Sequence, residues 1–229
     1  SGLTTTGATI FTDIESLTPG LLLWRSLTQW IGGMGIIVLT IALLPLLGIG
    51  GVELFTAEAP GPTSDKIHPR IRETAKRLWF IYVGLTGTLC LLLFLQGMSF
   101  FDSINHALTT MATGGFSTRN ASIAAFPQAS IQYTLAIFML IAGTNYTVLY
   151  YLFKRKFSTA WRSDEYRFYL VIVGILALIV GGGIWFNTDL GAEESFRTGL
   201  FQVASLLTTT GYVTADYTAW SGWLTVLSF

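Results

Sequence analysis

Long apolar stretches alternate along this chain with short polar ones that are rich in serine and threonine. Crossing the hydrocarbon of a bilayer, about 30 Å, takes roughly 20 apolar residues in a helix. Four stretches are about that long, and a fifth begins near Trp220 and runs to Phe229. The pattern therefore predicts an all-α integral membrane protein. The four stretches are residues 21–49, 78–98, 131–153 and 168–186.

Composition favours the same class over a soluble protein with buried helices. Of all residues, 52% are hydrophobic and only 11% are charged, whereas soluble domains carry about 25% charged residues. The single cysteine, Cys90, lies within an apolar stretch, where we expect inert packing. The sequence contains no nucleophile–base pair, no metal-ligand spacing and no basic nucleic-acid-binding face. We therefore expect neither an enzyme nor a nucleic-acid-binding protein.

Basic residues predict the orientation of the chain in the membrane. Of the 13 Lys and Arg residues, five lie between the first and second apolar stretches and five between the third and fourth. By the positive-inside rule these two connections are cytoplasmic. Alternatively, the basic residues of these connections could contact anionic lipid or a cytoplasmic partner. We favour the explanation that they only set the orientation of the chain. The intervening segments then face the outer compartment.

A serine- or threonine-rich stretch that ends in glycine occurs three times, at residues 1–7, 109–115 and 205–211. Aligned on Gly7, Gly115 and Gly211, the stretches share a hydroxyl at the first position, Leu or Met at the third and Thr at the fifth. All three fall in outward-facing segments, and two follow apolar segments too short to span a bilayer, 101–111 and 194–207. We interpret them as parallel, pseudo-symmetric repeats of transmembrane helix, pore half-helix, loop and transmembrane helix around a central pore.

The repeat predicts the organisation of the chain. We expect the cytoplasmic end of the second repeat to extend as a helix over residues 69–77. The predicted units are a first repeat with only its loop and return helix (1–50), a cytoplasmic connector (51–77), a complete second repeat (78–153), a cytoplasmic loop (154–167) and a third repeat with a truncated return helix (168–229), with a fourth repeat absent.

Three such loops together suit a permeating monovalent cation. Irregular backbone at membrane depth is tolerated where it is buried in protein or lines a water-filled cavity. A ring of backbone carbonyl oxygens can replace the hydration shell of a cation. No acidic residue lies within the three loops, so neutral oxygens and potassium or sodium are favoured over a divalent ion. A single loop of this kind could simply end a transmembrane helix. A sodium- or proton-coupled secondary transporter with broken helices is the alternative function, and a non-transporting scaffold is a third.

Several polar residues outside the loops are candidates for supporting the pore. Arg25 could snorkel, brace a loop or act on the ion path, and His106 is interpreted as a hydrogen-bonding residue of the second half-helix. Asp13, Asn120 and Asp216 follow the three glycines at similar distances and could line the outer mouth or cap their loops. The glycines at 32, 33 and 35 and at 181–183 predict close helix packing.

The sequence resembles the membrane subunit of bacterial Trk potassium uptake systems, and is closer to the TrkH branch than to the KtrB branch. The resemblance covers nearly the whole chain and is carried by SGLTTTGAT at 1–9, QWIGGMGII at 29–37, EAPGP at 58–62, PRIRETAK at 69–76 and GGFST at 114–118. It implies four non-identical repeats around one pore in the bacterial inner membrane. It also implies a homodimer and a cytoplasmic nucleotide-binding regulatory subunit, TrkA-like, as gating partner.

The same resemblance implies which residues would form the selectivity filter. Potassium would be the transported ion, with no covalently bound cofactor. The implied filter glycines are Gly7, Gly115 and Gly211, and the implied coordinating carbonyls belong to Thr5, Thr6, Thr113, Gly114, Thr209 and Thr210.

Overall fold

The computed structural model describes residues 1–35 and 68–215, and this part of the chain contains helices and loops but no strands. Residues 36–49 of the first apolar stretch, most of the connector at 51–77, the stretch beginning near Trp220, and Asp216 lie outside the described residues. The helices are α1 (Pro19–Trp30), η1 (Ile31–Gly35), α4 (His68–Leu95), α5 (Phe100–Met111), η3 (Ser122–Ala125), α6 (Ala129–Ala142), α7 (Tyr146–Phe153), α8 (Phe157–Trp161), α9 (Asp164–Asn187) and α10 (Ala192–Leu207).

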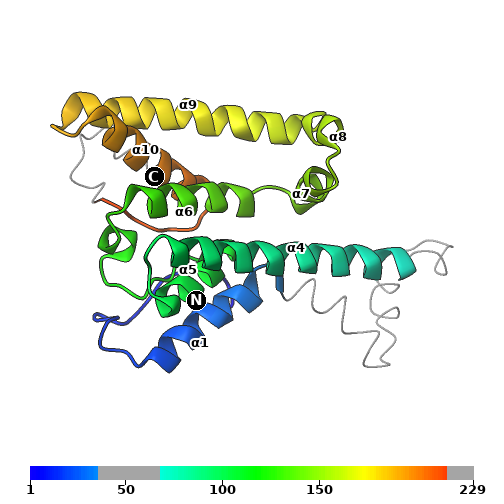
Figure 1. Ribbon diagram of the computed structural model, residues 1–229, viewed down its shortest axis with the longest axis horizontal. Helices are drawn as coiled ribbons and strands as arrows, with labels where there is room; N and C mark the ends of the chain where they lie inside the picture. Colours follow the sequence, from blue (N-terminus) through cyan, green and yellow to red (C-terminus); the bar gives the residue numbers. More distant parts are fainter. Residues whose placement is uncertain (36–67, 216–229) are drawn as a thin grey trace.

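Two long helices are each followed by a short helix that folds back against them. The pairs are α4 with α5 and α9 with α10, and within each pair the two helices pack on one another (Figure 1). The short helices confirm the half-helices expected at 101–111 and 194–207. Helix α4 also runs without interruption from His68 to Leu95, as expected for the extension over 69–77.

Among the described residues, two helices are long and apolar enough to cross a bilayer, at Lys76–Leu95 and Asp164–Asn187. The stretch 131–153, predicted as one continuous span, is instead divided into α6 and α7. Helix α6 ends at Ala142, and the N–H of the C-cap residue Gly143 donates to the Met139 carbonyl. The backbone carbonyl of Asn145, just before α7, accepts the N–H groups of Val148 and Leu149. This interruption lies beside α10, because a Cβ on Gly143 would lie 2.7 Å from the methyl carbon of Thr208.

The largest hydrophobic core lies between α4, α5 and α6. Tyr82, Leu89, Ile131 and Met139 are fully buried there. Helices α9 and α10 approach closely, because a Cβ on Gly181 would lie 3.1 Å from the Cα of Phe196. This contact confirms the packing role expected for Gly181, whereas at Gly182 a Cβ would meet no described atom within 4 Å. The outward faces of α4 and α9 are apolar and exposed, as a lipid-facing surface requires.

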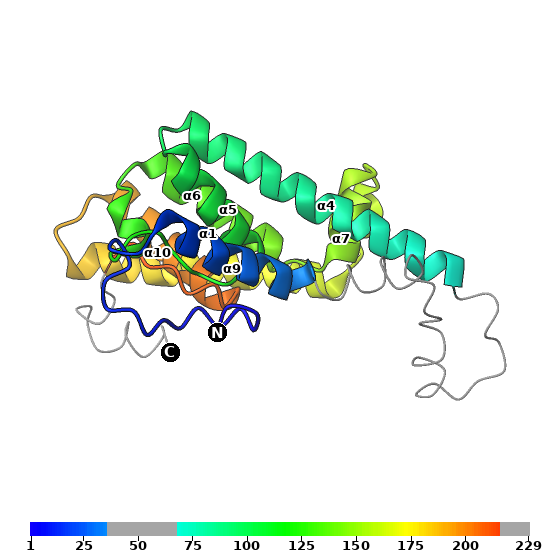
Figure 2. The same ribbon diagram turned by 90° about the horizontal axis from the view of Figure 1, so that it is seen from below.

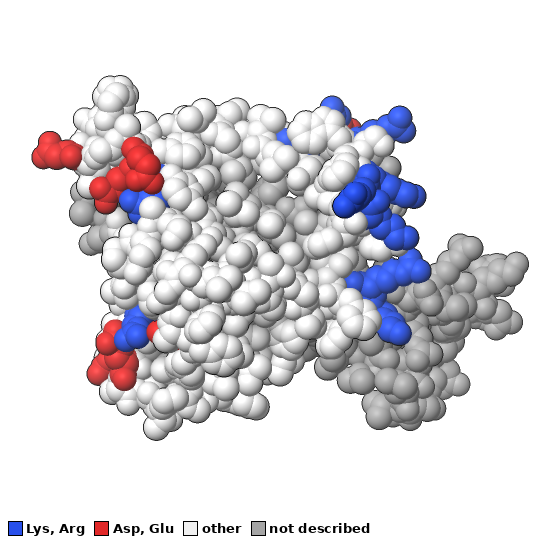
Figure 3. Space-filling model, in the orientation of Figure 1, with Lys and Arg blue, Asp and Glu red and all other residues white. Residues whose placement is uncertain are grey.

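Charged side chains separate to opposite ends of the molecule. Lys and Arg gather over the beginning of α4 and around α7 and α8, whereas most Asp and Glu gather at the other end (Figure 3). Seen from below, the N-terminal loop and the loop after α10 lie along the face away from α4 (Figure 2). The three Thr–Gly loops thus belong to one side of the helix bundle.

Candidate functional site

The three Thr–Gly loops share one backbone conformation. In each loop φ is positive at the glycine and at the threonine two residues before it, a region that L side chains rarely adopt. The repeat seen in the sequence is therefore also a repeat of backbone dihedral angles. The φ values are 52° and 75° at Thr5 and Gly7, 49° and 74° at Thr113 and Gly115, and 56° and 82° at Thr209 and Gly211.

The positive φ at threonine ends each half-helix. At the end of α5, the N–H of Thr113 donates to the Thr110 carbonyl at 3.0 Å and the N–H of Gly114 donates to the Thr109 carbonyl at 2.9 Å. This is the Schellman arrangement, in which glycine usually takes the left-handed position. Equivalent bonds join Thr209 to Leu206, Thr210 to Ser205, Thr5 to Gly2 and Thr6 to Ser1. In these loops a threonine takes the left-handed position that ends the helix, and the shared spacing places the glycine of the loop two residues after it.

Consecutive loops lie side by side with the same relationship each time. A Cβ on Gly7 would collide with the carbonyl oxygen of Gly114, and a Cβ on Gly115 would collide with the carbonyl oxygen of Thr210. In both cases the glycine of one loop meets the residue before the glycine in the next. At Gly211 a Cβ would meet no described atom within 4 Å. Glycine is needed at the first two positions both for φ and for this close approach.

The helices and outer segments repeat the same head-to-tail order. Helix α1, which follows the first loop, packs on α5, and α6, which follows the second loop, packs on α10. Beyond the loops, the N–H of Ile14 donates to Oδ1 of Asn120 at 2.7 Å, and the N–H of Ile123 donates to the Val213 carbonyl at 3.1 Å. The loops and helices of each repeat therefore contact those of the next in the same order, an arrangement of the kind that builds rings.

Gln29 on α1 holds the second loop from behind. Its Nε2 donates to the Gly114 carbonyl at 2.6 Å, and its Oε1 accepts the N–H of Phe116 at 3.2 Å. A Cβ on Gly114 would overlap this side chain. In the first and third loops the corresponding space holds a pair of threonine hydroxyls, Thr4 with Thr6 at 2.8 Å and Thr208 with Thr210 at 2.7 Å. A side chain of the neighbouring repeat thus substitutes for hydroxyls that the second loop lacks.

Arg25 lies one turn away on the same helix. Its guanidinium carbon is 4.3 Å from the ring centroid of Phe116 and 5.6 Å from that of Phe11. The side chain is buried, and its Nη1 and Nη2 have no hydrogen-bond partner among the described residues. Stacking on aromatic rings stabilises a guanidinium in such a place. Of the roles considered for Arg25, bracing the residue after Gly115 matches these contacts.

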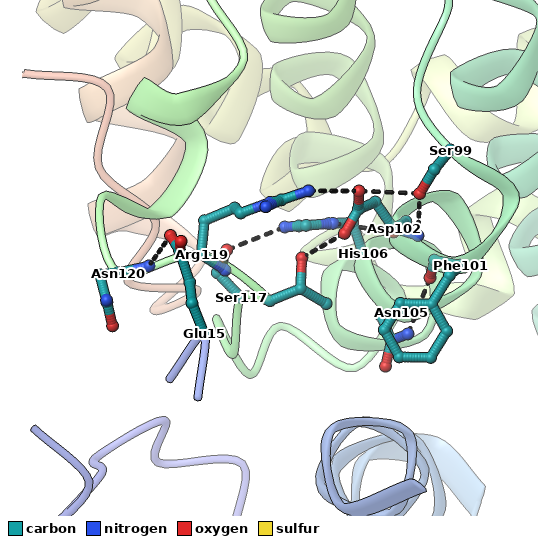
Figure 4. Close-up of polar contacts among 10 residues, drawn as sticks. Glu15, Ser99, Phe101, Asp102, Asn105, His106, Ser117, Arg119 and Asn120 are labelled. Atoms are coloured by element: carbon teal, nitrogen blue, oxygen red, sulfur yellow. Dashed lines mark hydrogen bonds and ion pairs between the residues drawn. The ribbon is translucent and has the colours of Figure 1, made fainter. Parts of the chain in front are cut away.

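Polar contacts fix the second half-helix to the segment after its loop (Figure 4). Ser99 caps α5 by accepting the N–H of Asp102 at 3.0 Å. The carboxylate of Asp102 accepts from the Thr118 hydroxyl at 2.6 Å and pairs with Arg119 at 3.1 Å. His106 is fully buried; its Nε2 lies 3.0 Å from the Ser117 hydroxyl and its Nδ1 lies 2.8 Å from the Asp102 carbonyl. These contacts match the structural role expected for His106.

Tyr212, which follows Gly211, reaches from the third loop to the second half-helix. Its hydroxyl lies 2.5 Å from Oγ1 of Thr109 and 3.3 Å from Oγ1 of Thr110. The Tyr212 carbonyl accepts from the Ser205 hydroxyl at 2.7 Å. The side chain is fully buried. Tyr212 therefore fixes the third loop both to its own half-helix and to the neighbouring one.

Asp13 and Asn120 meet at the outer side of the first two loops. Oδ1 of Asp13 accepts from the Asn120 amide at 2.8 Å and from the N–H of Glu15 at 3.1 Å. The hydrogen bond from Asn120 holds the pKa of Asp13 below its usual value. These are loop-capping contacts between consecutive repeats. Asp216, the third residue predicted for this group, lies outside the described residues.

Comparisons with known proteins identify the family. The model of the TrkH family, described as a cation transport protein, matches residues 1–178. The chain belongs to the TrkH family of cation transport proteins.

Individual relatives cover the whole of the described chain. The Trk system potassium uptake protein TrkH of Escherichia coli K12 is 45% identical over 99% of this chain and 48% of its own length. That of Halomonas elongata is 42% identical over 100% of this chain and 48% of its own length. The crystal structure of the potassium transporter TrkH from Vibrio parahaemolyticus superposes with a TM-score of 0.80 and 36% identity, covering 99% of this chain and 46% of that one. The chain spans about half the length of these relatives.

Within this TrkH-family fold, the structure brings most of the predicted site residues together. The nine predicted filter residues lie in three adjacent loops, and Arg25 and His106 lie directly behind the second loop. The sequence reading did not identify Gln29, Asp102 or Tyr212 as parts of this assembly. For Asp102 a local signal was available, because Ser99 and Asp102 have the spacing of a capping box. Gln29 and Tyr212 act between repeats and leave no local pattern.

Proposed function

We propose that this chain forms three of the filter loops of a potassium-translocating membrane subunit. Potassium would pass between the loops, coordinated by the backbone carbonyls of Thr5, Thr6, Thr113, Gly114, Thr209 and Thr210. A fourth loop, from a repeat outside this chain, would lie next to Gly211. The observation that carries the proposal is the head-to-tail contact of three loops with the same backbone conformation.

The chemistry of the loops supports a monovalent cation. The described loops offer carbonyl and hydroxyl oxygens and no carboxylate, which suits an ion of single charge. Helices α5 and α10 end at the second and third loops, so the partly negative ends of their dipoles favour a cation there. The Gly114 carbonyl accepts from Gln29, and its second lone pair remains for the ion.

The order of the repeats argues against a secondary transporter built from inverted repeats. Inverted repeats place successive motifs on opposite sides of the membrane. Here the second loop contacts the first and the third directly, through equivalent atoms each time. This relationship requires parallel repeats, which a channel-like filter uses.

The charge separation supports an orientation in the bacterial inner membrane. The basic end around the start of α4 and around α7 and α8 would face the cytoplasm, with the Thr–Gly loops opening to the outside. We further infer a homodimer, regulated by a nucleotide-binding TrkA-like subunit on the basic side. The relatives named above are potassium uptake proteins, which supports potassium as the transported ion.

Substitution of Gly115 in the full-length protein tests the proposal. In proteoliposomes, Gly115→Ala should lower the ratio of potassium to sodium flux by about tenfold or more, because a methyl group must displace the Thr210 carbonyl. Gly182→Ala on α9 is the matched control, since a Cβ there meets no atom within 4 Å. Circular dichroism would verify that both variants fold. An unchanged flux ratio in folded Gly115→Ala would refute the filter.

A further inference from the structure

Arg25 on α1 carries a buried positive charge without a hydrogen-bonding partner. The residue is 8% exposed, and its Nη1 and Nη2 donate to no acceptor among the described residues. The ion pairs of this part of the chain do not include Arg25 either. Burying an unpaired charge is costly, so buried guanidinium groups are normally paired with a carboxylate. Arg25 therefore departs from the usual arrangement of a buried cation.

Two aromatic rings hold the guanidinium in place. Its central carbon lies 4.3 Å from the ring centroid of Phe116 and 5.6 Å from that of Phe11. The faces of such rings attract a cation through their quadrupoles. An aromatic ring has no net charge, however, so the stacking fixes the position of the guanidinium and leaves its full charge in place.

The carboxylates of the adjoining segments have other partners. Asp13 and Glu15, which follow the first loop, both accept hydrogen bonds from Asn120. Asp102 on α5 pairs with Arg119 at 3.1 Å. Among the described residues, the field of the buried guanidinium is therefore not cancelled by a contact with a carboxylate.

This charge lies behind the second Thr–Gly loop. Gln29, one helical turn after Arg25, donates to the Gly114 carbonyl at 2.6 Å. Phe116, whose ring faces the guanidinium, directly follows Gly115. One turn advances about 5.4 Å along a helix, so the guanidinium is on the order of 10 Å from the Gly114 carbonyl. Inside a protein a charge still acts on an ion over that distance.

A fixed cation at this place changes how the loops treat ions of different charge. Neutral oxygens suit a monovalent cation, but a divalent cation of potassium's size that enters is held more strongly by the same carbonyl dipoles. Conduction requires binding weak enough for the ion to leave. A fixed positive charge opposes each ion in proportion to the charge of that ion, so it raises the energy of a divalent cation twice as much. The guanidinium thus supplies a discrimination that carbonyl oxygens lack.

We propose that Arg25 determines the charge specificity of the filter by repelling divalent cations of potassium's size. The inference rests on the proposed potassium filter and adds to it a residue that does not touch the ion. It is compatible with bracing, because the stacking that braces Phe116 also fixes the guanidinium behind the loop. A carboxylate beside Arg25 would cancel the field, which accounts for the lack of such a partner among the described residues.

Barium inhibition of potassium flux in proteoliposomes of the full-length protein tests the role of Arg25. Arg25→Met removes the charge and keeps an unbranched apolar chain against the two rings. The half-saturating potassium concentration should fall about threefold, and the inhibitory constant of barium, measured at low potassium, should fall about tenfold. The second factor is the square of the first, because barium carries twice the charge. Arg25→Lys keeps the charge and should stay close to the parent protein in both constants.

Phe11→Glu tests the same charge without changing Arg25. Phe11 is 41% exposed and its ring lies 5.6 Å from the guanidinium carbon, so the position accepts a carboxylate close to the charge. Both constants should shift in the same direction as in Arg25→Met. Phe11→Gln is the matched uncharged control, and Arg162→Met removes a positive charge at an exposed position after α8. These two variants should keep both constants close to those of the parent. Thermal unfolding verifies the fold of each variant.

The outcomes separate this inference from the proposed filter. A parent protein that carries no potassium would refute both. If the parent selects potassium over sodium, unchanged barium inhibition in folded Arg25→Met or Phe11→Glu would overturn only the role of Arg25. Equal factors for potassium and barium would indicate an altered loop shape and would also overturn it. An equal effect of Arg162→Met would mean a response to net charge alone, with the same consequence.

Discussion

The side chain of Gln29 holds the peptide groups on both sides of Gly115 in the neighbouring repeat. Its amide donates to the Gly114 carbonyl at 2.6 Å and accepts the N–H of Phe116 at 3.2 Å. Gln29 is 0% exposed, so neither bond competes with bulk water. The conformation of one filter loop is therefore determined in part by the helix that follows another.

Replacing Gln29 by leucine should disturb the second loop. The substitution leaves the Phe116 N–H unpaired in a buried place, at a cost of about 1–3 kcal/mol in the free energy of unfolding. We expect a lower melting temperature and a reduced ratio of potassium to sodium flux in the full-length protein. Gln128→Leu, at an exposed position before α6, is the control and should change neither quantity. Normal selectivity in Gln29→Leu would show that the loop does not need this contact.

The local pattern of the sequence predicted the helices and loops of the site better than the contacts between the repeats. Hydropathy and the positive-inside rule were enough to predict two half-helices and three loops, because these depend on segment length and on charge near each segment. Contacts such as Gln29 with Gly114 join residues far apart in the chain. Their identity depends on which repeat lies next to which, and a repeat pattern alone leaves that order open.

Tyr212→Phe should loosen the contact between the third loop and the second half-helix. The change removes a fully buried hydroxyl that lies 2.5 Å from Oγ1 of Thr109. A lost buried hydrogen bond destabilises the folded protein by about 1 kcal/mol, and here Thr109 keeps its bond to the Asn105 carbonyl. Thermal unfolding of the full-length protein would measure the effect. Tyr133→Phe removes an exposed hydroxyl bonded to Glu193 and should have a smaller effect; the reverse order would contradict the assignment.

Asp102 and Arg119 form an ion pair, and we expect the two residues to contribute unequally to the free energy of unfolding. The side chain of Asp102 is 7% exposed and also accepts from Ser99 and Thr118, whereas that of Arg119 is 42% exposed. Asp102→Asn should therefore lower the free energy of unfolding by about 2 kcal/mol, as expected for hydrogen bonds to a charged group. Arg119→Gln should lower it by less than about 1 kcal/mol, because solvent screens the pair. Chemical denaturation of both variants measures the difference, and equal losses would mean that the ion pair dominates.

The interruption between α6 and α7 shows where hydropathy failed. Residues 131–153 form one apolar run, and hydropathy alone predicts a single span. In the structure Gly143 lies against the methyl group of Thr208, the C-cap residue of α10, and a Cβ at position 143 would lie 2.7 Å from that methyl carbon. Gly143, the C-cap residue of α6, is therefore in contact with the third repeat. Hydropathy measures the preference of a segment for lipid and contains no information on such contacts.

The threonines in the left-handed conformation offer a test that separates loop geometry from fold stability. Thr113 holds φ at 49° and ends α5 by the bonds that glycine usually makes at this position. Thr113→Gly removes about 1–2 kcal/mol of strain from the folded state, whereas the greater conformational freedom of glycine lowers the free energy of the unfolded chain by about 0.4–1 kcal/mol. The two effects oppose each other, so stability should rise by no more than about 1.6 kcal/mol. The loop itself becomes freer, and we expect the ratio of potassium to sodium flux to fall while the melting temperature stays within a few degrees. Thr113→Val keeps the shape of the side chain and should retain more selectivity than glycine does. A large loss of stability in Thr113→Gly would contradict the strain assigned to this position, and full selectivity in both variants would show that the left-handed threonine has no part in setting the filter.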